Sequence, residues 1–129
     1  MNYFLTPFAD SAFGRQDVRE ILEELLKQGI FLTRNGRETN RPEIGTIVND
    51  FDIARILLAM KQIRYLFEPS SSYSLGSYGA KHMLERDMAH LGLIKKYIAN
   101  GDFIVAMILS GYQVRFNQSP NAVFKAKKK

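Results

Sequence analysis

Two histidine–carboxylate pairs are the residues whose types and spacing come closest to a catalytic arrangement. His82 and Glu85 are three positions apart, as are Asp87 and His90, so each pair shares one face of a helix. In such a pair, the carboxylate can orient a histidine that acts as a general base. Salt bridging on a helix surface is the simpler explanation of both pairs. We therefore expect no catalytic residues and a protein that is not an enzyme.

A metal or phosphate site is also poorly supported. His82 and His90 are eight positions apart, more than two helical turns, so they do not readily reach one ion. The chain has no cysteine, which removes disulfides, thiolate chemistry and zinc sites built on sulfur. Residues 75–81 contain glycines and a lysine, but not at the spacing of a Walker phosphate loop. The sequence predicts neither a metal nor a cofactor.

Positive charge is concentrated in two short segments. The net charge is +5, and four lysines in residues 125–129 supply four of these charges, which leaves 14 Lys and Arg against 13 Asp and Glu. A second basic segment carries Arg34, Arg37 and Arg41. A lysine-rich tail attracts DNA, RNA or an acidic membrane, and a terminus that only increases solubility is the alternative. No apolar run approaches the roughly 18 residues of a membrane span, so none is expected.

Hydrophobic periodicity predicts four helices that must position these groups. They are expected at residues 16–28, 47–67, 78–91 and 103–110. The second is apolar most of the way round, which is typical of a central, buried helix. The fourth contains no Arg, Lys, Asn or Gln, so it is expected to be buried on all sides.

A strand pattern occurs near the end of the chain. Residues 112–117 alternate between apolar and polar side chains, residues 118–121 favour a turn, and residues 122–125 are predicted to form the returning strand. Asn35-Gly36 favours a tight turn within residues 30–40, where a small hairpin and a plain loop are both compatible with the sequence. The expected fold class is α+β and mainly helical, with a C-terminal β-hairpin.

The second half of the chain has a winged-helix-like element order: helix, helix and then a β-hairpin as the wing. A recognition helix must present polar or basic side chains to base edges, and residues 103–110 offer none. We therefore expect this element order without docking of the fourth helix in a major groove. The third helix, which carries Lys81 and His82, is predicted to be the better exposed surface.

The expected organisation is one globular domain over residues 15–124, between an apolar arm at residues 1–14 and the lysine-rich tail at residues 125–129. A serine-rich loop at residues 70–77 separates halves of about sixty residues, which are too short for two independent cores. The arm carries several phenylalanines, and a segment so rich in aromatics needs either its own core or a partner to cover it.

Several segments within about the last fifty residues form a pattern. Residues 77–85 read SYGAKHMLE and residues 97–104 read YIANGDFI, and GY at 111–112 and PNA at 120–122 follow. Together they resemble a short pattern in small uncharacterised proteins of phages and large DNA viruses. The resemblance implies a viral or mobile-element origin, with no activity attached to these positions. We accordingly expect a cytoplasmic location inside a host cell, or association with a virion.

Helix capping and packing account for most of this pattern. Ser77 and Asn100 are expected to cap helices, and Lys81 can pair with Glu85 one turn away. Lys81 and His82 are harder to explain by structure alone. They are therefore the first candidates for a functional surface.

Two functional hypotheses follow. In the first, a small accessory protein binds nucleic acid nonspecifically through phosphate contacts. In the alternative, the protein is an interaction module, such as a viral subunit, an adaptor or an inhibitor of a host factor, and binds a protein partner or a second copy of itself. The phosphate-binding candidates are Arg34, Arg37, Arg41, Lys81, Arg115, Lys125, Lys127, Lys128 and Lys129, and the protein-binding candidates are Phe4, Phe8, Phe13 and His82.

Aromatic side chains offer a second mode of nucleic-acid contact, by stacking on unpaired bases beside Arg115 and Lys125. Burial against a sheet or a helix end accounts for several of them without any ligand. The aromatic candidates are Tyr73, Tyr78, Tyr97, Tyr112 and Phe116. The two functional hypotheses differ most in whether the basic groups converge on one face.

Overall fold

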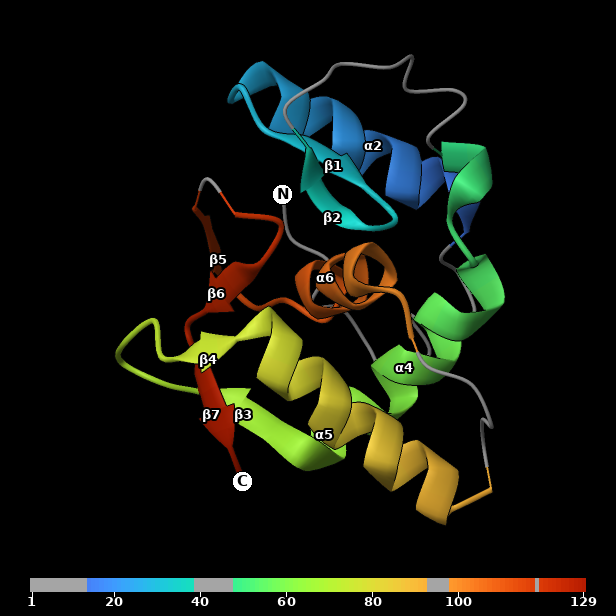
Figure 1. The fold of residues 1–129 in the computed structure, drawn as a ribbon, viewed down its shortest axis with the longest axis vertical. Coiled ribbons are helices and arrows are strands. Elements are labelled where there is room, and N and C mark those ends of the chain that lie inside the picture. The colour runs from blue at the N-terminus through green and yellow to red at the C-terminus, as the bar shows by residue number, and fades with distance from the viewer. Residues whose placement is uncertain (1–13, 39–47, 93–97, 118) are drawn as a thin grey trace.

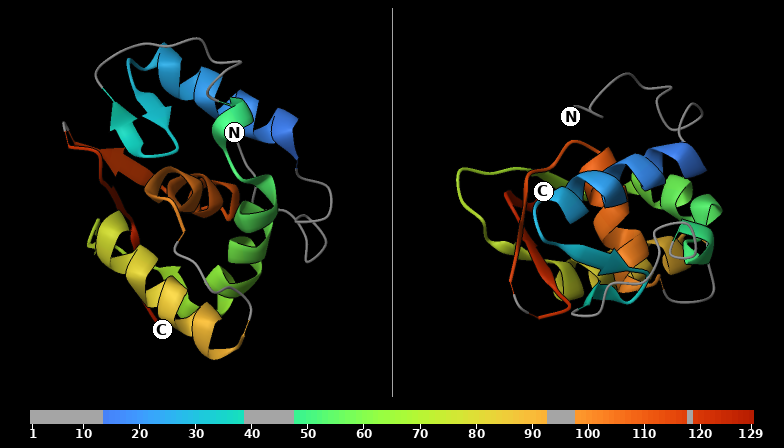
Figure 2. Two further views of the ribbon diagram at one scale, coloured as in Figure 1. Left: turned by 45° about the vertical axis from the view of Figure 1, so that its right-hand side comes forward. Right: turned by 90° about the horizontal axis from the view of Figure 1, so that it is seen from above.

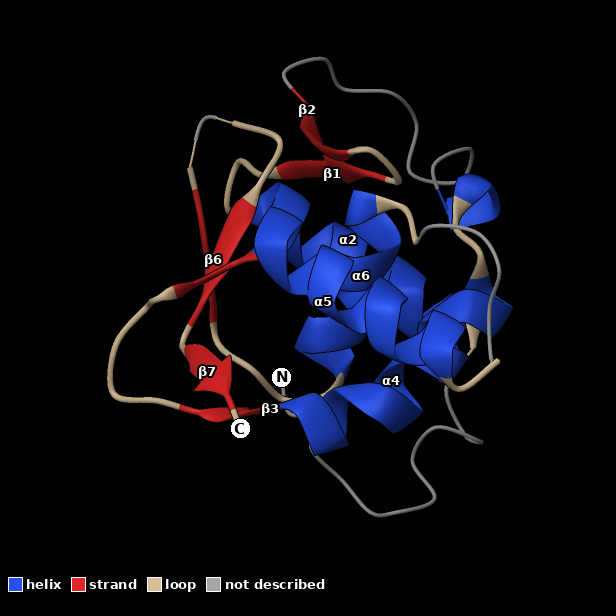
Figure 3. Cartoon of the chain, turned by 60° about the horizontal axis from the view of Figure 1, so that its bottom comes forward, coloured by secondary structure: helices blue, strands red, loops and turns tan. Residues whose placement is uncertain are grey.

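The computed structural model describes residues 14–38, 48–92, 98–117 and 119–129, and the fold is the expected mainly helical α+β class (Figure 1). The helices gather into one group, and the short strands lie along its flanks (Figure 3). No helix in the described ranges is long and apolar enough to cross a membrane. The elements are α2 (Arg15–Lys27), β1 (Phe31–Thr33), β2 (Gly36–Glu38), α4 (Ile53–Leu66), β3 (Phe67–Pro69), β4 (Leu75–Gly76), α5 (Ser77–His90), α6 (Asn100–Leu109), β5 (Val114–Phe116), β6 (Ala122–Phe124) and β7 (Ala126–Lys128).

Helix α2 forms where an amphipathic stripe was predicted. The Asp17 carboxylate accepts a hydrogen bond from the Gly14 amide at 2.7 Å, which satisfies a donor at the start of the helix. Gly29 follows the helix at φ 78°, a conformation that favours glycine, and directs the chain into β1. The helix buries Val18, Ile21, Leu22 and Leu25 in the core.

Residues 31–38 form a hairpin, which resolves the choice between a hairpin and a loop. Strands β1 and β2 pair antiparallel with Thr33 opposite Gly36, and Gly36 has φ 117° at the turn. Together with α2, this hairpin lies against one side of α6 (Figures 1 and 2).

Helix α4 begins later than residue 47, where the sequence analysis placed its start. Residues 48–50 form a separate helical turn, Phe51 is buried, and α4 begins at Ile53. The cause is Asp52, whose Oδ1 accepts the Arg55 amide at 3.1 Å and so acts as the N-cap. The helix ends at Leu66, close to the expected residue 67, and β3 follows directly.

Helix α6 lies at the centre of the described fold, with α2 and the β1–β2 hairpin on one side and α4 and α5 on the other (Figures 1 and 2). The expectation that this helix is buried on all sides is confirmed. Eight of its ten residues are buried: Gly101, Asp102, Phe103, Ile104, Val105, Ala106, Met107 and Leu109.

The predicted C-terminal hairpin is confirmed, and it belongs to a larger arrangement. Strands β5 and β6 pair antiparallel, and β4 joins β6 to give the strand order β4-β6-β5. A second small sheet pairs β3 with β7, so residues 126–128 of the segment assigned to a lysine-rich tail form a strand. Helices α5 and α6 precede the β5–β6 hairpin, which is the winged-helix-like order expected from the sequence.

The core joins elements from both sides of the serine-rich loop. Phe103 on α6 makes edge-to-face contacts with Phe67 on β3 and Phe124 on β6, at centroid distances of 6.5 and 6.0 Å. All three side chains are at most 1% exposed. These contacts fix the two small sheets against α6 and so set the position of the residues on their outer face.

Candidate nucleic-acid interface

Three side chains meet on the outside of the C-terminal sheet. The Arg115 guanidinium carbon lies 4.1 Å from the centroid of the Tyr73 ring, and the Lys125 Nζ lies 5.9 Å from the same centroid. The Tyr73 hydroxyl donates to Gln113 Oε1 at 3.2 Å. We name Tyr73, Arg115 and Lys125 the Tyr73 face. An aromatic ring flanked by two cations is suited to a ligand that carries both phosphates and flat bases.

The strand register positions this face. Arg115 is opposite Val123 in the β5–β6 pair, and the Lys125 amide donates to the Gln113 carbonyl at 3.0 Å. Ala122 and Phe124 are buried, so strand alternation places the side chain of Val123 on the outer side, with Arg115 beside it. The β5–β6 pairing and the bond from the Lys125 amide therefore hold both cations beside the Tyr73 ring, which lies in the serine-rich loop.

The remaining lysines of the expected tail lie on or beside β7. Lys127 is opposite Glu68 and Lys128 is opposite Phe67, while the Lys129 amide donates to the Leu66 carbonyl at 2.8 Å. Ala126 is fully buried, so alternation directs Lys127 toward solvent. These lysines are exposed, but their backbone is held in a sheet, and Glu68 offsets part of the positive charge of Lys127.

Arg37 connects the N-terminal hairpin to the C-terminal one. Its Nη1 donates to the Asn117 carbonyl at 2.5 Å, and its amide donates to the Pro120 carbonyl at 3.1 Å. Arg37 is half-buried, and its guanidinium is already engaged at the loop that joins β5 to β6. Arg37 therefore serves first as a link between two parts of the fold.

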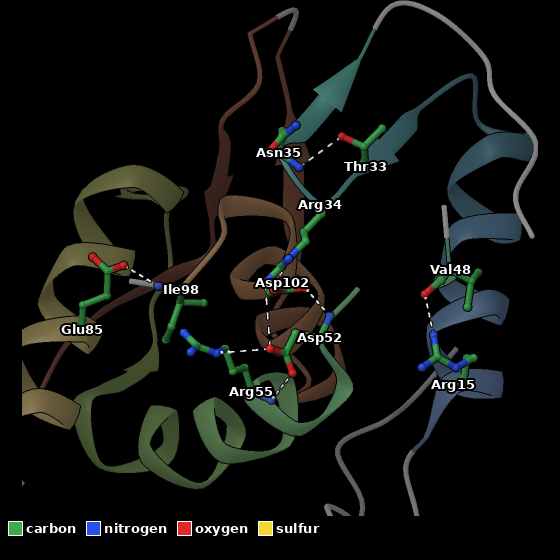
Figure 4. A network of polar contacts seen from close by, with 10 residues as sticks. All are labelled: Arg15, Thr33, Arg34, Asn35, Val48, Asp52, Arg55, Glu85, Ile98 and Asp102. Atoms are coloured by element: carbon green, nitrogen blue, oxygen red, sulfur yellow. Dashed lines mark hydrogen bonds and ion pairs between the residues drawn. The ribbon is translucent and has the colours of Figure 1, made fainter. Parts of the chain in front are cut away.

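Arg34 belongs to an internal charge network rather than to the Tyr73 face (Figure 4). Its Nε donates to Asp102 Oδ2 at 2.9 Å, and the other oxygen of that carboxylate accepts the Asp52 amide at 3.1 Å. Asp52 Oδ2 in turn lies 3.2 Å from Arg55 Nε. Burial raises the pKa of Asp102 above its ordinary value of 3.8, and the hydrogen bonds from Arg34 and from the Asp52 amide oppose this only in part.

Lys81 is also engaged internally. Its side chain is only 8% exposed, and its Nζ lies 3.3 Å from Glu85 Oε2, which confirms the expected pair one helical turn apart. Glu85 Oε2 also accepts a hydrogen bond from the Ile98 amide at 2.5 Å. The other carboxylate oxygen, Glu85 Oε1, lies 2.8 Å from His82 Nδ1. Lys81 therefore does not reach the Tyr73 face. The His82 side chain is 43% exposed and packs edge-on against the Tyr78 ring.

Several predicted residues lie outside the described ranges. They are Phe4, Phe8 and Phe13 of the N-terminal arm, Arg41 of the second basic segment, and Tyr97 among the aromatic candidates.

The segments at residues 77–85, 98–104 and 120–122 contact one another. The buried Ser77 does not cap α5, whose N-cap is Gly76, and its hydroxyl instead accepts the Ala122 amide at 3.0 Å. Asn100 likewise does not cap α6, and its Nδ2 donates to the Pro120 carbonyl and to Asn121 Oδ1, both at 3.1 Å. Both predicted caps were wrong, because the two side chains bind a strand and a loop distant in sequence.

Two elements of the site were not assigned from the sequence. Asp102 was not singled out by any sequence pattern, although it is fully buried and central to the charge network. The position of Tyr73 over Arg115 depends on the β4-β6-β5 order, for which two-residue β4 gives no sequence signal. Aromatic character beside basic residues was the only signal available, and it did not separate Tyr73 from the other candidates.

No family model matches the sequence, and no curated protein or solved structure has significant similarity to it. Within the described ranges, no group of three or more histidines, cysteines or carboxylates is arranged to hold a metal ion.

Proposed function

We propose that this protein binds nucleic acid nonspecifically, through contacts between backbone phosphates and the Tyr73 face. One observation supports the proposal most: Arg115 and Lys125 approach the same aromatic ring, at 4.1 and 5.9 Å from its centroid. Two cations held close together on a sheet create a local positive potential that a polyanion can use. Lys127, on the neighbouring strand β7, extends the positive charge.

The same geometry narrows the set of phosphate contacts. Arg34 and Lys81 pair with buried or half-buried carboxylates, so they contribute to the fold rather than to the binding surface. Arg37 donates to the Asn117 carbonyl and is a secondary candidate. Binding through Arg115, Lys125 and Lys127 is expected to be weak and only modestly dependent on salt, because few phosphates are neutralised.

The biological setting is an accessory role in a virus or mobile element. Support comes from the resemblance of segments within about the last fifty residues to small phage and viral proteins. Nonspecific binding suits such a role, since it needs no fixed target sequence.

A protein-interaction role is the alternative, and helix α5 supports it. Tyr78 is 59% exposed and Leu91, directly after the helix, is 56% exposed, while His82 packs beside Tyr78. Exposed apolar side chains near a helix surface are a common feature of protein interfaces. Tyr78→Ser would weaken such a partner's binding and leave nucleic-acid binding unchanged.

Fluorescence anisotropy with labelled DNA oligonucleotides, across about 25 to 200 mM salt, tests the main proposal. The double variant R115Q/K125Q should bind more weakly, with a slope of log affinity against log salt smaller by about 1.4 to 1.8. The control K27Q/R64Q removes the same charge from exposed positions on α2 and α4. Absence of binding at low salt, or equal weakening in both double variants, would contradict the proposal.

A further inference from the structure

We propose that the Tyr73 face selects single-stranded over duplex nucleic acid, with Arg115 and Tyr73 forming a platform on which an unpaired base stacks. This inference builds on the proposed function and names its ligand class. Arg115 is exposed and its guanidinium lies over the Tyr73 ring, 4.1 Å from the centroid. A guanidinium held against an aromatic ring is a flat surface of the kind that unpaired bases stack on.

The platform is ordered before any ligand binds. The Tyr73 hydroxyl is tied to Gln113 Oε1 at 3.2 Å, and Arg115 covers its ring. Gln113 and Arg115 belong to a segment held by the β5–β6 pairing and by the bond from the Lys125 amide. A preformed site loses little conformational entropy on binding, so a small surface can still hold a base.

Stacking alone does not hold a nucleic acid, and the surroundings supply the phosphate contacts. Lys125 Nζ lies 5.9 Å from the same ring centroid, close enough to meet the phosphate of a stacked nucleotide. The Ser74 hydroxyl donates to the Ala126 carbonyl at 3.2 Å, which brings the serine-rich loop against β7 next to Lys127. A single strand that stacks on this platform therefore has Lys125 beside the ring and Lys127 on the adjacent strand β7.

Two features that winged-helix proteins use to bind a duplex are lacking in the described residues. Helix α6, which has the position of a recognition helix in the element order, is buried from Gly101 to Met107. The loop between β5 and β6 has the position of the wing tip, and residues 117–121 read NQSPN, without any Arg or Lys. Wings and arms that enter a minor groove use basic side chains for that purpose. Bases in a duplex are stacked on each other and do not offer a face to Arg115.

A comparison of the affinities for single-stranded and duplex DNA tests the inference. An oligothymidine of about 15 nucleotides and a duplex of the same length are titrated against the protein at one low salt concentration. The expected result is that the single strand binds at least about tenfold more tightly than the duplex, although the duplex carries more charge.

Three variants separate the contribution of stacking from that of charge. Tyr73→Leu should weaken single-strand binding roughly 5- to 150-fold, with the salt slope unchanged because tyrosine carries no charge. Tyr73→Phe keeps the ring, loses only the bond to Gln113, and should bind within about threefold of the wild type. Arg115→Lys keeps the charge at an exposed position but removes the planar group, so it should also weaken single-strand binding at constant slope.

The outcomes separate this inference from the proposed function. Duplex binding equal to or tighter than single-strand binding, or full affinity in both Tyr73→Leu and Arg115→Lys, overturns the single-strand inference and leaves phosphate binding in place. Absence of binding to either form overturns both. Circular dichroism of each variant confirms the fold, and Arg115→Lys carries the test if Tyr73→Leu does not fold.

Discussion

Arg34, at the turn of the β1–β2 hairpin, donates its Nε to Asp102 Oδ2 at 2.9 Å, and that carboxylate is completely buried at the start of α6. The second oxygen of Asp102 accepts the amide of Asp52, the residue that caps α4. One buried carboxylate therefore joins the N-terminal hairpin to two helices. The Gly101 amide adds a bond of 2.7 Å to the Arg34 carbonyl at the same junction.

Removing Arg34 alone should lower the unfolding free energy more than removing both Arg34 and the Asp102 carboxylate. Arg34→Met leaves the Asp102 carboxylate buried without its ion-pair partner, and we expect a loss of about 3 kcal/mol in unfolding free energy at neutral pH. The double variant R34M/D102N should be more stable than R34M. Urea denaturation measures both. Lys27→Met, which breaks an exposed pair with Glu24, should cost at most about 0.5 kcal/mol. Equal losses of unfolding free energy for Lys27→Met and Arg34→Met would contradict a buried ion pair between Arg34 and Asp102.

The pH dependence of stability should identify Asp102 directly. Burial raises the pKa of Asp102 in the folded state above 3.8, its value in the unfolded chain. At a pH between the unfolded and the folded pKa, the folded protein therefore binds more protons than the unfolded chain. The contribution of Asp102 to stability is therefore complete below pH 3.8 and decreases as pH rises through the raised pKa. The unfolding free energies of the wild type and of D102N are measured from acidic to neutral pH. Subtracting the second from the first cancels the contributions of the other carboxylates to the pH dependence. The difference should fall with rising pH, and a flat difference would refute this.

Gly101 should tolerate no side chain. A Cβ at this position would lie 2.0 Å from the Thr33 carbonyl oxygen and 2.7 Å from the Arg34 carbonyl carbon, and both of these are backbone atoms that cannot easily move. We expect Gly101→Ala to lower the unfolding free energy by about 1 to 3 kcal/mol. Gly79→Ala is the matched control, since it lies in α5 with no atom within 4 Å of the added Cβ, and should stabilise by about 0.5 to 1 kcal/mol. Thermal denaturation distinguishes the two, and melting temperatures that move together would contradict the close approach.

Deleting residues 126–129 should destabilise the protein, whereas neutralising the three lysines of this segment should not. Strand β7 pairs with β3, and its loss would remove both this pairing and the fully buried Ala126, at a cost of about 2 kcal/mol. The triple variant K127Q/K128Q/K129Q keeps the backbone pairing and should change stability by less than about 0.5 kcal/mol. Because truncation alters the fold, the triple variant is the better probe of charge. Equal stability of the truncated and full chains would contradict the pairing.

Much of the fold was predictable because it depends on local patterns. The stripe of apolar residues on α2 and the uniformly apolar α6 specify burial regardless of what packs against them. The C-terminal hairpin follows from alternation and a turn. The start of α4 was misplaced because Asp52 caps the helix in competition with earlier residues, and its amide is fixed by Asp102 from another element.

The candidate site was predictable only in part. Arg115 and Lys125 were named from charge and from their place on predicted strands. Their convergence on Tyr73 depends on pairing between segments forty or more residues apart, which composition does not encode. For the same reason Arg34 and Lys81 were assigned to phosphate contact, since their partners Asp102 and Glu85 become decisive only through burial.

The burial of α6 has a consequence for how the molecule opens. Its residues from Phe103 to Met107 have no exposed surface, and elements from both ends of the chain cover it. Its amide hydrogens can exchange with solvent only when the surrounding elements separate together. In a hydrogen-exchange experiment, α6 should therefore exchange at the rate of global unfolding, while α2 and the β1–β2 hairpin on the periphery open and exchange earlier.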